Sequence, residues 1–310
     1  MRRLSGGVLI PLIVLAAVLI LPLLPLGRSE GFLLALATRV MIFAIAAVSL
    51  DLILGGGGLV SFGHAAFMAI GAYAVAILDA NNVVDGAVVV PVAMAAGAAF
   101  ALLTGAISLR TRGVYFIMIT LAFAQMVFFI AGSLAQYGGD DGYTLYGRTE
   151  LFGWPVLEGP RGLYWSSLAV LVAAWALCRA LLASRFGRVL RAARENRTRV
   201  EALGYAPLRF QLLAYVIAGV IASLSGVLLA NAAEFVSPAY ASWHRSGELL
   251  VMVILGGVGS IHGAILGAAS VVLLEEYLPH LTEHWRMIFG VLLVLAVLFF
   301  RRGIAGVLRG

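Results

Sequence analysis

The chain has 310 residues, of which 62% are hydrophobic and 12% are charged, and its mean hydropathy is +1.03. This composition excludes a water-soluble globular protein and predicts a membrane protein built from apolar helices of about 20 residues. All 21 basic residues are arginine, so the lysine of a nucleotide-binding P-loop is impossible. The net charge of +6 lies mainly between apolar runs, where it sets membrane topology, and we expect no binding of nucleic acid.

The chain shows no recognisable catalytic or metal-binding motif. Its five histidines form neither an HExxH motif nor a zinc-ligand spacing with cysteine, and no G-x-S-x-G elbow is present. Cys178 is the only cysteine, which excludes an internal disulfide framework. We therefore expect no catalytic residue, no metal and no cofactor bound by this chain.

Apolar runs follow one another along almost the whole chain. They cover approximately residues 7–26, 32–50, 59–78, 87–109, 113–133, 163–183, 209–232, 247–258, 261–278 and 285–300. The run 247–258 is too short to cross a bilayer and predicts a half-helix or a re-entrant segment. The first run lacks a following small-residue cleavage site, so we interpret it as a retained helix. The runs together predict an all-α polytopic integral membrane protein with about 8–10 transmembrane helices in one domain, residues 1–310.

Two glycine-rich breaks interrupt these runs, at residues 55–58 and in the sequence LGGVGS at 255–260. Broken backbone inside a membrane is tolerated only where protein buries it or where it lines a cavity. The breaks therefore favour a translocation path, although a plain interhelical turn explains each one separately. We expect the two breaks to be related elements that meet in the interior, nearer the cytoplasmic side. The candidate path residues are Gly55, Gly56, Gly57, Gly58, Ser61, His64, Gly256, Gly257, Gly259 and Ser260.

Three polar residues lie close to the first break. Ser61 is expected to cap a helix at 61–78, and that helix start could also present free N–H groups to a substrate carboxylate. His64 is expected to be buried and bonded to a backbone carbonyl. Asp51 lies at the end of an apolar run, where we expect it to be solvated.

Arginines predict the membrane topology. The positive-inside rule places the following residues in the cytoplasm: Arg2, Arg3, Arg110, Arg112, the segment 179–209, Arg301, Arg302 and Arg309. The loop at about 134–162 is rich in acidic residues and is expected to be external. Both termini are then cytoplasmic.

The segment at about 184–208 carries a second informative pattern. Arg188, Arg191 and Arg194 recur at every third residue, beside a smaller apolar face. This spacing predicts a short amphipathic helix that ends near Gly204, with Pro207 beyond it. The alternative is an arginine cluster that only orients the chain and contacts lipid headgroups.

Several separated motifs resemble one family of transporters. Glu201, Ala202 and Gly204 are similar to the EAA-x-G-type cytoplasmic loop of ABC importer permeases, which docks on the ATPase subunit. The other matching stretches are GLVSFGHAAF at 58–67, GAY at 71–73, RGVYF at 112–116, SRFGR at 184–188 and LGGVGS at 255–260. Together they resemble the branched-chain amino acid ABC transporter permease family, and within it the M-type subunit.

This resemblance implies a function and a set of partners. The chain would be the permease subunit of an importer for branched-chain or hydrophobic amino acids in the bacterial inner membrane, and it would not itself be an enzyme. Its partners would be a second homologous permease, two cytoplasmic ATPases that use ATP and Mg²⁺, a periplasmic or lipid-anchored substrate-binding protein, and membrane lipids. The coupling residues would be Arg188, Arg191, Arg194, Glu201, Ala202 and Gly204.

Two other functions remain open at the level of the sequence. An ABC permease for urea or short amides would carry the same motifs. A secondary transporter or channel would also use glycine-broken helices. It would, however, need its own coupling residues, and the centres of the predicted helices contain no acid.

Overall fold

The computed structural model describes residues 30–150, 153–154, 156–299 and 303–307. The apolar run 7–26 and the terminal arginines at positions 2, 3, 301, 302 and 309 lie outside the described residues. The α-helices are α2 (Glu30–Asp51), α3 (His64–Ala80), α4 (Gly86–Ser108), α5 (Val114–Ser133), α6 (Pro160–Ala183), α7 (Arg185–Glu195), α8 (Arg197–Ala202), α9 (Pro207–Ala233), α10 (Trp243–Gly256), α11 (Ile261–Leu281), α12 (Trp285–Phe299) and α13 (Gly303–Val307). The protein is an all-α, multi-pass membrane protein, as the sequence predicts.

Six of the described helical segments are long and apolar enough to cross a membrane. They are Glu30–Gly56, Gly86–Ser108, Val114–Ser133, Pro160–Ala183, Pro207–Ala233 and Ile261–Leu281. The expected 8–10 crossings are therefore not all full-length helices, because α3 and α12 are shorter. Helix α10 has 14 residues, and at about 1.5 Å per residue it spans about 21 Å of a hydrocarbon core of about 30 Å.

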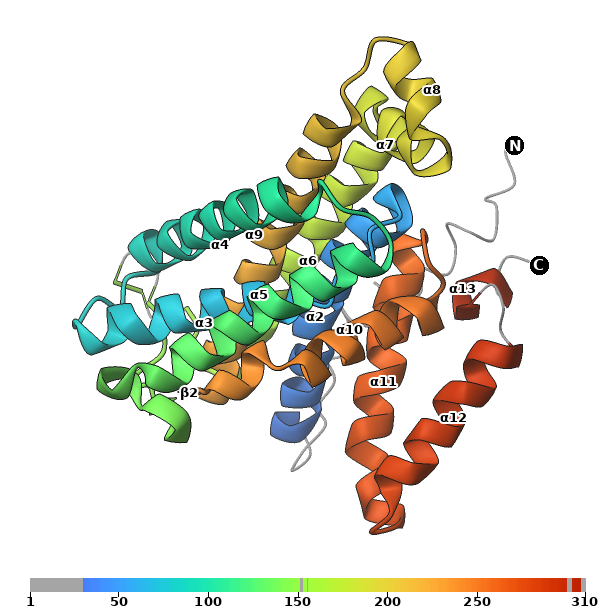
Figure 1. Ribbon diagram of the computed structural model, residues 1–310. Helices are drawn as coiled ribbons and strands as arrows, with labels where there is room; N and C mark the ends of the chain where they lie inside the picture. The colour runs from blue at the N-terminus through green and yellow to red at the C-terminus, as the bar shows by residue number, and fades with distance from the viewer. Residues whose placement is uncertain (1–29, 151–152, 155, 300–302, 308–310) are drawn as a thin grey trace, which may run out of the picture.

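Helix α2 is the hub of the bundle. Every residue from 41 to 57 is buried, so this stretch faces protein on all sides. A helix that is apolar all round and surrounded by other helices needs no amphipathic stripe, and α2 packs against α6, α9, α10 and α11. In Figure 1 it runs through the middle, with α3, α4 and α5 on one side and the α11–α12 pair on the other.

Small residues let α3 and α9 approach closely. A Cβ at Gly71 of α3 would collide with the backbone carbonyl of Ser223, and a Cβ at Gly226 of α9 would collide with the carbonyl of Met68. Helices inside a membrane gain little from apolar burial alone, so close backbone packing at small residues holds them together. The GAY motif at 71–73 therefore has a packing role.

The connections at one end of the bundle are joined to each other. Strand β1 (Tyr143–Thr144) pairs antiparallel with β2 (Phe235–Val236), so the α5–α6 connection is attached to the α9–α10 connection. The Asp79 carboxylate accepts hydrogen bonds of 3.1 Å from the Tyr143 hydroxyl and from the Tyr146 amide. Burial and this bond to Asp79 raise the pKa of Tyr143 to about 12, so the phenol stays a neutral donor.

The arginine-rich connections lie at the opposite end. Helices α7 and α8 project beyond the other helices there (Figure 1), and the α4–α5 turn with Arg110 and Arg112 is at the same end. Helix α13 also lies there, because a Cβ at Gly303 would collide with the backbone of Gly257 at the end of α10. One end of the molecule is thus basic and the other carries the acidic loop.

Candidate functional site

The first glycine break is a helical distortion followed by an extended segment. Helix α2 continues into a π-helical turn, η3 (Leu52–Gly56), and the chain then runs without helix from Gly58 to Gly63. Gly58 has a φ of +69°, a conformation that favours glycine. A π-turn widens the helix locally, and such turns are frequent at functional positions.

The second break is the turn between α10 and α11. Gly257 and Gly259 have φ values of +112° and +83°, so glycine is required by the backbone at both. Ser260 then caps α11 by accepting a bond of 3.3 Å from the amide of Gly263. Glycines at positions 256, 257 and 259 therefore turn the chain sharply back along α10.

The two breaks contact each other. A Cβ on Gly55 would collide with the Cα of Gly259, and it would lie 2.5 Å from Oδ1 of Asp51. The amide of Gly259 donates a 2.7 Å hydrogen bond to that same carboxylate oxygen. We call this contact between residues 55–58 and 256–260 the glycine junction.

Asp51 holds the glycine junction together from inside. The sequence placed this acid in solvent, and that expectation was wrong, because Asp51 is fully buried. The reason is that the buried helix continues beyond Asp51 through the π-turn η3, and that Gly259 of the second break packs against the carboxylate. Oδ1 is bonded to Gly259, whereas Oδ2 has no hydrogen-bond partner among the described residues.

Arg194 connects the basic end of the molecule to the glycine junction. Its Nη1 donates a 2.6 Å hydrogen bond to the carbonyl of Gly55, and its aliphatic stem lies against Gly58, where a Cβ would be 2.7 Å from its Cγ. Leu190, one turn earlier in α7, is fully buried against Gly56 and Gly57. The face of α7 with Leu190 and Arg194 therefore rests on the first break.

The segment predicted at about 184–208 corresponds to the connection between α6 and α9, residues 184–206, which we call the arginine segment. It is two helices and not the single helix predicted from the sequence. The two helices, α7 and α8, are separated by Asn196, whose backbone is extended. The Asn196 side chain caps α8 by accepting a 3.0 Å hydrogen bond from the amide of Arg199. Helix α8 is stabilised by an Arg197–Glu201 ion pair of 2.8 Å, ends at Ala202 and is followed by Gly204 with a φ of +83°.

The rest of the predicted coupling set is on the surface. Arg188, Arg191, Glu201, Ala202 and Gly204 are all exposed. Arg194 is exposed as a whole residue too, but among the described residues it is the member of that set with a contact to the glycine junction.

Ser61 is not the predicted N-cap. Helix α3 begins at His64, and Ser61 instead accepts a 3.2 Å bond from the amide of Gly63. The extended chain that leaves the break delays the helix by three residues. Amides near the helix start are already used, because Phe62 donates to Thr120 at 3.2 Å and Ala65 donates to Ser246 at 3.1 Å. These groups are therefore not open to a substrate carboxylate.

His64 lies inside the α2–α3 contact. Its Nε2 is 2.7 Å from Oγ of Ser49, so the expected backbone carbonyl partner is wrong. The Ser49 hydroxyl donates its one hydrogen to the carbonyl of Ala46, so Nε2 of His64 is the donor to Ser49. Fully buried, and edge-on to Phe67, His64 fastens α3 to α2 and does not line an opening.

No group of three or more His, Cys, Asp and Glu residues is arranged to hold a metal ion in the part of the chain that the structure describes. The site is thus a contact between two helix breaks, with a buried carboxylate and an arginine.

Comparison of the whole sequence with known protein families identifies the family. The sequence matches the family described as "Branched-chain amino acid transport system / permease component" over residues 32–297. The chain belongs to this permease family.

Individual permeases show how broad the relationship is. LivM, the high-affinity branched-chain amino acid transport system permease protein of Salmonella typhimurium, is 29% identical over 297 residues, covering 88% of this chain and 70% of LivM. LivH of the same system and organism is 32% identical over 127 residues, 40% of each chain. The ribose import permease protein RbsC of Escherichia coli is 27% identical over 305 residues, covering 94% of this chain and 91% of RbsC. No solved structure matches the chain.

Within this permease, sequence reasoning missed two groups of the site. Ser246 of α10 was not singled out, although it bonds the start of α3. Asp51 was noticed but placed in solvent. The sequence did indicate that Asp51 is unusual, because an acid shortly before a glycine run inside an apolar segment has to be paired or exposed.

Proposed function

We propose that this chain is a permease subunit of an ATP-driven importer for branched-chain or other hydrophobic amino acids. Its similarity to LivM over most of its length supports this substrate class. Its similarity to LivH, a second permease of the same transport system, supports pairing with a second permease. ATP and Mg²⁺ would be used by two cytoplasmic ATPases, and a substrate-binding protein would deliver the ligand at the external face.

The arginine segment is the proposed docking site for the ATPase. Its tip carries exposed apolar side chains, since Leu203 is 71% and Tyr205 is 50% exposed on either side of Gly204. Exposed apolar groups outside the membrane core are typical of a surface that another protein covers. The positive-inside rule places this tip in the cytoplasm, where the ATPases would be.

The observation that carries the proposal is the bond between Arg194 and Gly55. Movement of α7 by a docked ATPase would be transmitted through this 2.6 Å bond to the first break, and through Asp51 and Gly259 to the second. The glycine junction would then act as a gate at the cytoplasmic side. This arrangement supports coupling to a partner chain better than it supports a secondary transporter or a channel.

The function is tested with the assembled transporter in proteoliposomes. We expect leucine-loaded binding protein to stimulate ATP hydrolysis and leucine uptake, whereas urea and ribose should stimulate neither. Stimulation by urea or ribose but not by leucine would show that the substrate class is a different one. Transport without the ATPases would contradict the importer mechanism.

The coupling bond is tested by Arg194→Ala. A hydrogen bond from a charged donor is worth about 1.5–3 kcal/mol, so we expect leucine uptake to fall by about tenfold or more while ATP hydrolysis continues. Arg286→Ala removes an exposed arginine of α12 and serves as the control. Equal uptake by Arg194→Ala and this control would reject the coupling role.

A further inference from the structure

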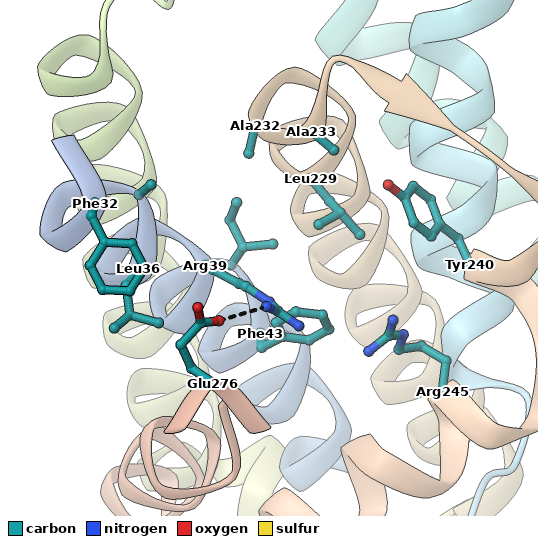
Figure 2. Close-up of a pocket in the computed structure, with 12 residues that line it drawn as sticks. Phe32, Leu36, Arg39, Phe43, Leu229, Ala232, Ala233, Tyr240, Arg245 and Glu276 are labelled. Carbon is teal, nitrogen blue, oxygen red and sulfur yellow. Dashed lines mark hydrogen bonds and ion pairs between the residues drawn. The ribbon is translucent and has the colours of Figure 1, made fainter. Parts of the chain in front are cut away.

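A cavity of about 380 Å³ opens between α2, α9, α10, α11 and the short helix η6 (Pro238–Ala241), as Figure 2 shows. It is distant from the arginine segment, because Phe32 at the start of α2 and Ala233 at the end of α9 both line it. Pockets for small molecules have volumes of about 300–1,000 Å³. This cavity is at the small end of that range, which suits a molecule of the size of an amino acid.

Charged side chains from three different helices face this cavity. Arg39 comes from α2, Arg245 from the first turn of α10 and Glu276 from α11 (Figure 2). Arg39 and Glu276 belong to membrane-spanning segments. Ionised groups at membrane depth are costly, and they mark ligand or ion pathways where they face a water-filled cavity.

The ion pairs around the cavity leave binding capacity on both arginines. Arg39 is 3.4 Å from Glu276 and 3.5 Å from Glu275, longer than the roughly 2.7–2.9 Å of a strong charge-assisted bond. Its side chain is 41% exposed. Arg245 pairs with Glu248 at 2.5 Å through one nitrogen, while a guanidinium carries five N–H donors. Each arginine can therefore engage a further carboxylate.

The remaining wall is apolar. Leu36, Phe43 and Leu229 line the cavity beside the charged groups, and the guanidinium carbon of Arg245 lies 5.2 Å from the centre of the Phe43 ring. Burial raises the pKa of Tyr240, which also lines the cavity, so its hydroxyl is neutral. An aliphatic chain would thus be enclosed by apolar groups while both charge signs are within reach.

The two arginines pair with three carboxylates, those of Glu248, Glu275 and Glu276, so the cluster offers both charge signs and no excess of positive charge. A simple anion attracted by Arg39 would meet the Glu276 carboxylate beside it, and a simple cation drawn to Glu276 would meet the guanidinium of Arg39. A molecule with one positive and one negative group avoids both repulsions. A free α-amino acid has that property and adds a side chain for the apolar wall.

We propose that this cavity binds a free, zwitterionic α-amino acid with an aliphatic side chain. Arg245 and Arg39 hold the ligand carboxylate, Glu276 holds its ammonium group, and Phe43 and Leu229 contact the side chain. The choice of an amino acid rests on the proposed function. The cavity itself is a site inside one permease subunit, separate from the glycine junction and at the opposite end of α2.

The binding test uses the purified transporter complex in nanodiscs, without binding protein and without nucleotide. We expect saturable binding of radiolabelled L-leucine. The competitors are 4-methylpentanoate, which lacks the ammonium group, and 3-methylbutylamine, which lacks the carboxylate. We expect both to compete far more weakly than unlabelled leucine. Equal competition by 4-methylpentanoate would show a plain anion site, and displacement by phosphatidylglycerol alone would show a lipid-headgroup site. Either result overturns the proposal.

Variants locate the binding in this cavity. Arg245→Gln and Glu276→Gln should each weaken leucine binding by about tenfold or more, because each removes a charged partner. Ala232→Phe fills the cavity without changing any charge and should abolish binding. Arg161→Gln removes an exposed Arg161–Glu30 ion pair outside the cavity and is the matched control. Variants are compared only as monodisperse complexes, and unchanged binding in Ala232→Phe overturns the proposal even if a charge variant fails to fold.

This inference and the proposed function can fail separately. Leucine uptake by the wild-type transporter, together with normal leucine binding in the cavity variants, would refute this site alone. Absence of leucine-stimulated ATP hydrolysis in the wild-type transporter would refute the substrate class on which it rests.

Discussion

At the scale of single residues, the glycines of the junction are not equivalent. Gly55 is held between Asp51 and Gly259 with no room for a methyl group, whereas a Cβ on Gly57 would be 3.5 Å from its nearest neighbours, Leu190 and Leu59. The sequence ranks both positions equally because they belong to one run of four glycines. Only the packing shows that Gly55 is the point of contact.

Gly55→Ala should therefore impair transport, whereas Gly57→Ala should not. Forcing a methyl group into close-packed space costs about 1–3 kcal/mol, so we expect either a lower melting temperature or at least a severalfold loss of leucine uptake for Gly55→Ala. Gly57→Ala should stay within about twofold of the wild type in uptake, an order-of-magnitude bound for an ordinary van der Waals contact. Uptake and thermal unfolding in detergent measure both effects, and identical behaviour of the two variants would show that the breaks do not touch tightly.

At the scale of elements, the predicted helices were mostly right in kind and often wrong in their ends. The apolar runs give the spanning helices directly because bilayer thickness fixes their length. The start of α3 is displaced from residue 61 to 64 because amides of the extended segment bond to Thr120 and Ser246, which belong to other helices. The split at Asn196 had a local signal, since asparagine is a strong N-cap.

Most contacts between distant elements could not be obtained from the sequence. Arg39 and the pair Glu275–Glu276 stand out as charges inside apolar runs, so their importance could have been noticed. Their pairing across more than 230 residues depends on how α11 lies against α2. The same holds for Asp51 and Gly259, which are 208 residues apart. The similar sequences of the two breaks did predict that residues 55–58 and 256–260 meet, and they do. The individual groups that make such contacts could not be read from one sequence.

The tip of the arginine segment offers an element-scale prediction. Gly204 has a positive φ, and no atom lies within 4 Å of the position that a Cβ would occupy, so a side chain there would point into open space. Gly204→Ala and Gly204→Trp share the backbone strain, but only tryptophan adds bulk at the proposed docking surface. We expect Gly204→Trp to abolish ATPase binding and uptake with insertion intact, and Gly204→Ala to retain most of both. Co-purification of the ATPase measures this, and normal coupling in Gly204→Trp would show that the segment only orients the chain.

At the scale of the whole molecule, the structure collects the basic connections at one end and the acidic connections at the other. The α6–α9 connection carries six arginines between Arg185 and Arg199, and the α4–α5 turn adds Arg110 and Arg112 at the same end. The acidic α5–α6 connection is joined at the far end to the α9–α10 connection through β1 and β2. For a polytopic chain with this asymmetry, the positive-inside rule predicts that the arginine-rich end lies in the cytoplasm.

This orientation predicts opposite labelling of two exposed positions in intact cells. Asp141→Cys in the α5–α6 connection should react with a membrane-impermeant maleimide added outside, whereas Arg191→Cys in α7 should react only after the membrane is opened. Both positions are exposed in the structure, and Arg191 is preferable to Arg194 because the latter is bonded to Gly55. The background variant is Cys178→Ala, since that buried thiol is the only native one. External labelling of Arg191→Cys would show that the orientation in the membrane is the reverse of the predicted one. It would also remove the proposed ATPase docking, because a segment outside the cell cannot meet a cytoplasmic ATPase, and the cavity of Arg39 and Arg245 would then open toward the cytoplasmic half of the membrane.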